Sequence, residues 1–206
     1  MKRAPLLVAG VLWLGVEASA DERTTCATAD AAPTVGILVV DYERIPRHIW
    51  ARAERNVTLM YQSISASTTW RRIYPDAKAP PASPARINEY PFTVVIPSAV
   101  MAPRKSDGDR VLGLAPYSGD KRGRLAYVFY DRIVAVARRT GVHPAEILAY
   151  VLAHEIGHLL LPVHAHADAG VMRAELDFRT LRPILHRAGL FTPDQRDLIR
   201  WSMSCE

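Results

Sequence analysis

The chain has 206 residues, of which 49% are hydrophobic and 23% are charged, a composition typical of a folded globular protein rather than a disordered one. The net charge of +5 is mild, and no lysine- and arginine-rich run is interleaved with aromatic residues, so nucleic acid is not an expected partner. Beyond the N-terminal segment no run of 18 apolar residues occurs, so no membrane span is expected there. Nothing in the sequence indicates an oligomeric state.

Residues 1–20 have the layout of a secretory signal peptide. The basic residues Lys2 and Arg3 precede the 13-residue apolar run APLLVAGVLWLGV, and the small residues ASA end the segment at Ala20. An apolar run of this length is too short to span a bilayer comfortably. We therefore expect a secreted or periplasmic protein that loses residues 1–20 and keeps residues 21–206 as a single domain.

The first half of this domain is expected to contain strands and one long helix. Residues 34–42 (TVGILVVDY) are β-branched and apolar, which predicts a buried strand. Apolar residues at helical spacing predict an amphipathic helix over 45–64, and a second strand is expected at 65–75. Residues 75–91 hold five prolines and are predicted to be an irregular surface loop.

Further strands are predicted in the middle of the chain. Residues 92–100 (FTVVIPSAV) and 125–133 (LAYVFYDRI) are both apolar and rich in β-branched or aromatic residues. A shorter strand is expected within 110–116, and a glycine-rich charged loop follows it. Residues 134–141 are predicted to form a short helix or turn that ends at a glycine.

Two helices are predicted in the last third of the chain. Residues 143–161 have Pro144 in the first turn and are apolar nearly all round, so this helix is expected to be buried in the domain. The last helix, over 190–203, has a clear start, because Thr192 can cap it and Gln195 stands three residues later.

A candidate metal-binding motif begins in the second half of the buried helix. Residues 153–176 (AHEIGHLLLPVHAHADAGVMRAEL) contain four of the seven histidines in the chain. On a helix His154 and His158 lie on one face and can bind one metal ion, while Glu155 is placed to reach a water held by that ion. Catalytic zinc sites take three protein ligands and leave one position for water. The motif therefore predicts one Zn²⁺, with Glu155 as the general base.

The third zinc ligand has two main candidates, His164 and His166. Pro162 disfavours helical geometry at Leu161, so the chain is expected to leave the helix there and to need some length before it returns to the metal. His166 has two residues more reach than His164 and is the preferred ligand, with His164 as the alternative. Asp168 is a more distant candidate, since carboxylates also bind zinc.

The motif resembles that of the metzincins, a clan of zinc endopeptidases with His-Glu-x-x-His-x-x-Gly-x-x-His and a methionine-containing turn below the metal. In this sequence the glycine position of that pattern falls on Leu161 and its third histidine on His164, whereas small exported bacterial metzincin-like proteins have a longer spacing that matches His166. The Met-turn matches AGVMR, which places Met172 beneath the metal.

The resemblance implies an α+β fold with a mixed twisted sheet, a long helix, a buried active-site helix, and a small C-terminal subdomain with the Met-turn and a final helix. It also implies that one strand between Phe92 and Tyr130 is an exposed edge that pairs with an extended peptide substrate. A tyrosine that assists catalysis in some of these families is replaced here by Ala174.

The expected function is therefore that of an exported zinc-dependent endopeptidase that hydrolyses peptide bonds in a peptide or protein substrate. Two alternatives remain open at this point: a zinc-bound but non-catalytic exported binding or structural protein, and a zinc amidase that acts on cell-wall material. The two cysteines, Cys26 and Cys205, are candidates for a disulfide that ties together the ends of the exported chain.

Overall fold

Five strands and four helices make up the described part of the chain, and they come from segments that are far apart in sequence. The computed structural model describes residues 33–75, 90–101, 111–116, 123–161, 166–175 and 190–204. In chain order the elements are β1 (Thr34–Asp41), α1 (Arg47–Gln62), β2 (Ser67–Ile73), β3 (Phe92–Ile96), β4 (Gly113–Leu114), β5 (Leu125–Val128), α3 (Tyr130–Thr140), α4 (Pro144–Leu160) and α6 (Pro193–Ser204).

The five strands form one mixed sheet in the order β2-β1-β3-β5-β4. The strands β2, β1, β3 and β5 pair in parallel with their neighbours, whereas β4 runs antiparallel to β5 and lies at one edge. The central strand β1 is buried over most of its length, as is typical of an apolar strand between two parallel neighbours. The predicted mixed sheet is thus confirmed, with parallel pairing predominant.

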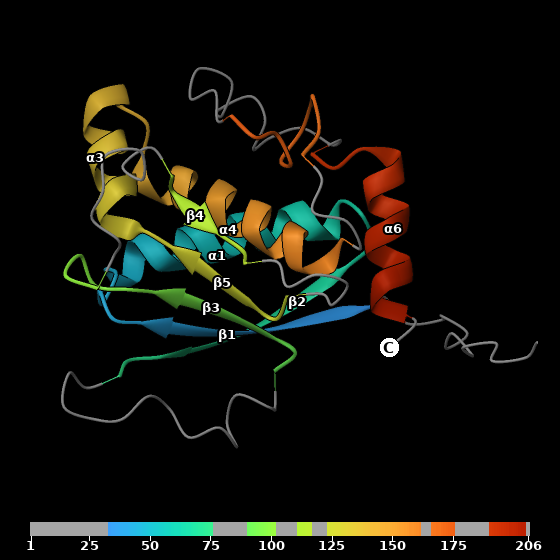
Figure 1. The fold of residues 1–206 in the computed structure, drawn as a ribbon, viewed down its shortest axis with the longest axis horizontal. Coiled ribbons are helices and arrows are strands. Elements are labelled where there is room, and N and C mark those ends of the chain that lie inside the picture. Colours follow the sequence, from blue (N-terminus) through green and yellow to red (C-terminus); the bar gives the residue numbers. More distant parts are fainter. Residues whose placement is uncertain are drawn as a thin grey trace, which may run out of the picture.

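Two helices, α1 and α4, lie side by side on one face of the sheet, while α6 stands near one end of them (Figure 1). Apolar residues of α1, among them Ala53, Val57 and Met60, are buried in the core beside apolar residues of α4. The helix α4 is buried nearly all round, as predicted. None of the helices in the described part of the chain combines the length and the apolar character that a bilayer crossing requires.

The predicted ends of several elements differ from those in the structure. The prediction of one strand over 125–133 was wrong, because β5 ends at Val128 and α3 begins at Tyr130. The side chains of Ile133 and Val136 are buried at helical spacing, and Asp131 in the first turn of α3 complements the helix dipole. The strand predicted over 92–100 is also too long.

The start of α6 confirms the predicted capping box. The Thr192 backbone N–H donates to Gln195 Oε1 at 3.0 Å, and the Gln195 N–H donates to Thr192 Oγ1 at 3.2 Å. Each residue thus satisfies a backbone donor that the first turn of the helix leaves without a partner.

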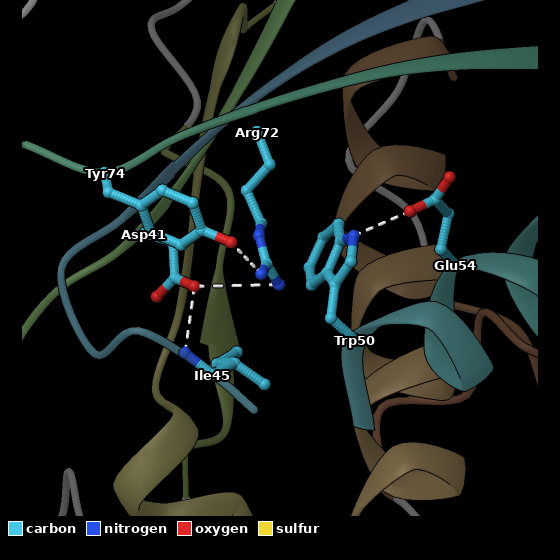
Figure 2. A network of polar contacts seen from close by, with 6 residues as sticks. All are labelled: Asp41, Ile45, Trp50, Glu54, Arg72 and Tyr74. Carbon is cyan, nitrogen blue, oxygen red and sulfur yellow. Dashed lines mark hydrogen bonds and ion pairs between the residues drawn. The ribbon is translucent and has the colours of Figure 1, made fainter. Parts of the chain in front are cut away.

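A polar network at the carboxyl end of β1 links the sheet to α1 (Figure 2). The carboxylate of Asp41 accepts a hydrogen bond from the Ile45 backbone N–H at 3.0 Å and lies 3.8 Å from Arg72 Nη1. Arg72 also hydrogen-bonds the hydroxyl of Tyr74, and its guanidinium stacks 5.0 Å from the Trp50 ring centre. Burial raises the pKa of Asp41, although the Ile45 hydrogen bond and the Arg72 charge act in the opposite direction.

Replacing Asp41 with asparagine is expected to change how stability depends on pH. Because the pKa of Asp41 is higher in the folded than in the unfolded chain, the wild type loses free energy of unfolding as pH rises between these two values. The asparagine variant lacks this loss, so its stability relative to the wild type should improve as pH rises above about 4, the ordinary pKa of an aspartate side chain. Urea unfolding at several pH values gives the free energy of unfolding of both proteins. A difference between them that does not change with pH would contradict the prediction.

Candidate metal centre

The helix α4 carries the first part of the predicted motif, and its two ends follow from local sequence. Pro144 occupies the first turn, and His143 caps the helix by accepting a hydrogen bond from the Ala145 backbone N–H at 3.2 Å. At the other end Leu161 has extended backbone angles of −78° and 138°, as expected for a residue that precedes proline. The chain thus leaves the helix at the predicted position.

Two histidines of α4 come together with a third from the segment that follows the helix. The group consists of His154, His158 and His166, and one ring nitrogen of each lies within 4.8 Å of those of the other two. The Nε2 atoms of His154 and His158 face each other at 3.0 Å, and the His166 ring centre lies 5.4 Å and 5.0 Å from those two rings. Three imidazole nitrogens bound tetrahedrally at about 2.1 Å from one zinc ion would lie about 3.4 Å apart. The donor set and its spacing therefore fit zinc.

The orientation of His154 suits it for a metal. Its Nδ1 lies 2.8 Å from the backbone oxygen of Val171, a carbonyl that can only accept a hydrogen bond. Nδ1 must then carry the proton in the neutral ring, which leaves the Nε2 lone pair directed toward the other two histidines. Metal-binding histidines commonly use a backbone carbonyl in this way to fix ring orientation and tautomer.

Of the two candidates for the third ligand, His166 lies in the histidine group, whereas His164 lies outside the described residues. Asp168 is not part of the group. The disulfide candidates Cys26 and Cys205 also lie outside the described residues.

Glu155 is buried between α4 and the edge strand β4. The residue is only 5% exposed, and burial raises the pKa of its carboxyl group to about 8, while a hydrogen bond from the Ala115 backbone lowers it. Close contact with β4 is possible because residue 113 is glycine: a Cβ atom there would lie 2.5 Å from Glu155 Oε1. The edge strand and the residue after it therefore fix the position of the carboxylate.

Met172 packs beneath the helix at Gly157, the fourth residue of the sequence HEIGH. Met172 is fully buried, and a Cβ atom at position 157 would overlap its sulfur atom. The turn that carries Met172 is closed by a hydrogen bond from the Ala167 N–H to the Met172 carbonyl at 2.8 Å. Gly157 thus allows this turn to approach the helix between the two histidines.

The overall fold has a counterpart among solved structures. The fold is similar to that of an archaemetzincin. The chain aligns with the crystal structure of archaemetzincin from Methanopyrus kandleri with a TM-score of 0.51 and 16% sequence identity, over 82% of this chain and 95% of that one. No family model and no curated protein matches the sequence. The similarity concerns the overall fold, a mostly parallel five-stranded sheet with helices.

Some parts of the site could not be found from the motif alone. The predicted substrate edge lies between Phe92 and Tyr130, and within this range the strand at the edge of the sheet is β4. Contacts of β4 with Glu155 were missed, as were those of Gly157 with Met172. Gly157 in HEIGH and Gly113 in VLGLAP are the sequence features that indicate these contacts, because each allows a close approach that a side chain would prevent.

Proposed function

We propose that the protein is an exported zinc-dependent endopeptidase of metzincin-like architecture, with residues 1–20 removed as a signal peptide and residues 21–206 forming the catalytic domain. The observation that carries the proposal is the group of three histidines next to a buried glutamate. The archaemetzincin-like fold supports the same class of protein.

His154, His158 and His166 are proposed as the protein ligands of one zinc ion. One ring nitrogen of each lies within 4.8 Å of those of the other two, and the Val171 carbonyl orients His154. His164 remains the alternative third ligand. Met172 is proposed to form the floor of the site as the methionine of a Met-turn, on the basis of its packing against Gly157.

Glu155 is proposed as the general base. Bound zinc would supply a Lewis acid that polarises the substrate carbonyl and makes water more acidic. Glu155 would accept a proton from the attacking water and later donate it to the amine that leaves when the peptide bond breaks. The Ala115 hydrogen bond holds the carboxylate in place, and a zinc ion bound nearby would favour its ionised form.

The edge strand β4 is proposed as the place where an extended peptide pairs with the enzyme. Its partner β5 occupies one side, and the other side is the edge of the sheet. Adding a peptide strand to such an edge uses backbone hydrogen bonds and tolerates many side chains. Because β4 also touches Glu155, a peptide bound there would lie beside the proposed base.

The test is to measure zinc content and peptide cleavage in the same preparation of residues 21–206. We expect about one zinc per chain and cleavage of a diverse peptide mixture that a chelator abolishes and added Zn²⁺ restores. In a matched pair of variants, His166→Ala is expected to lose zinc and His164→Ala to retain it. The reverse result would make His164 the third ligand.

Other outcomes separate the proposed peptidase from the alternative functions. A protein that binds zinc and leaves peptides intact, but releases products from cell-wall fragments, would be an amidase. One that binds zinc and cleaves neither substrate would support a binding or structural role. A protein with all its histidines that binds no zinc would contradict the proposed metal site itself.

A further inference from the structure

Tyr150 links α4 to the turn that contacts the first histidine. It stands one helical turn before His154, on the same face of α4. The side chain is buried, and its hydroxyl donates a hydrogen bond of 2.7 Å to the Gly170 carbonyl. Burial raises the pKa of the Tyr150 phenol to about 12, although the charge of Arg173 lowers it. The hydroxyl therefore keeps its proton and remains a donor near neutral pH.

The Gly170 carbonyl belongs to the peptide group that joins Gly170 to Val171, and this group is held at both ends. The Tyr150 hydroxyl donates to the Gly170 oxygen of this group, and the Val171 N–H at its other end donates to the Leu190 carbonyl at 2.7 Å. The next carbonyl along the chain, that of Val171, is the group that contacts His154 Nδ1 at 2.8 Å. A rotation of the Gly170–Val171 peptide would therefore move the carbonyl that orients His154.

We propose that Tyr150 is a positioning residue for the metal centre: its hydroxyl fixes the Gly170–Val171 peptide, so that the Val171 carbonyl holds His154 with Nε2 directed toward the metal site. The consequence for metal affinity depends on the zinc site proposed above. The effect on the orientation of the His154 ring is independent of that zinc site, because the hydrogen bonds that fix the ring are formed by the protein alone.

The variant Tyr150→Phe tests this role, because it removes the hydroxyl and keeps the ring that packs in the core. Tyr61→Phe is a matched control: the Tyr61 hydroxyl is also buried and donates to a carbonyl of α4, that of Ala153, at 3.1 Å. Tyr150→Phe loses a hydrogen bond that a phenol of α4 donates, and Tyr61→Phe loses one that a carbonyl of α4 accepts. Of these two hydroxyls, that of Tyr150 bonds the turn that carries Val171.

Zinc affinity is measured by competition with a chelator of known affinity. We expect Tyr150→Phe to bind Zn²⁺ about 10-fold more weakly than the wild type, as is typical when a group that orders a metal ligand is lost. Tyr61→Phe should retain wild-type affinity, although both variants should unfold at a lower denaturant concentration. Wild-type affinity in Tyr150→Phe, or an equal loss in both variants, would overturn the proposal.

A second measurement uses the metal-free proteins and remains informative if the proposed zinc site is wrong. Nitrogen-15 NMR of the histidine rings reports which ring nitrogen carries the proton. In the wild type and in Tyr61→Phe, His154 is expected to be protonated at Nδ1, whereas Tyr150→Phe should show a mixture of tautomers. An unchanged His154 signal in Tyr150→Phe would overturn the positioning role, whether or not the wild type binds zinc.

Discussion

Replacing Glu155 with glutamine is expected to lower kcat/KM for peptide cleavage by about 10³-fold and to leave the zinc content unchanged. Glutamine has nearly the shape of glutamate, and its side-chain oxygen can still accept the hydrogen bond from the Ala115 backbone. It has no carboxylate that can take a proton from water. The variant therefore removes the proposed base and preserves its surroundings.

The measurement compares the wild type, Glu155→Gln and a control, Glu146→Gln, at equal zinc loading. Glu146 is a second buried glutamate of α4 and lies in the first turn of that helix. Its Oε1 atom is 2.6 Å from Nη2 of Arg52 in α1. Its replacement should cost some stability and leave kcat/KM within about twofold of the wild type. If Glu155→Gln retained more than about a tenth of wild-type activity, Glu155 would not be the base.

The sequence was most informative where a feature depends on residues close together along the chain. Capping of α6 by Thr192 and Gln195 uses neighbours three apart, and the end of α4 at Leu161 follows from the next residue. Likewise His154 and His158 share a helix face because they are four apart. Each of these predictions rests on local geometry that the surrounding structure does not alter.

Boundaries within an apolar run were harder to predict. The stretch LAYVFY is rich in β-forming residues, so no residue before Asp131 marks the change from β5 to α3. In the structure, the Phe129 N–H donates to the Leu112 carbonyl, and Arg132 donates to the Val111 carbonyl at 2.8 Å. These contacts with a distant segment help to define where the strand ends and where the helix begins.

The environment of Glu155 could not be predicted for a similar reason. Its pKa and position depend on Gly113 and Ala115, which lie about 40 residues earlier and reach it only when β4 pairs with β5. A motif specifies which residue is the base, but the strand that packs on that base is determined by the tertiary fold. The same holds for Tyr150 and its bond to Gly170.

Gly113→Ala is therefore expected to impair catalysis without removing zinc. The added Cβ would lie 2.5 Å from Oε1, 2.7 Å from Cγ and 2.8 Å from Cδ of Glu155, so the carboxylate or the strand must shift. Glu155 is buried and has little free space, and a displacement of about 1 Å in a catalytic group can cost about 10² in rate. We expect a fall of about 100-fold in kcat/KM, mostly in kcat.

Steady-state kinetics and zinc analysis of Gly113→Ala measure this effect, with Gly36→Ala as the control. Gly36 is a glycine of the same sheet in β1, where a Cβ would approach Pro91 Cδ to 3.1 Å and no residue of the proposed site is among the nearest atoms. Gly36→Ala should lower the free energy of unfolding and leave kcat unchanged. A rise in KM alone in Gly113→Ala would mean that the strand moved and the base did not. Since β4 touches Glu155 and also forms the edge proposed to bind the peptide, the division between kcat and KM shows which of these two roles depends on Gly113.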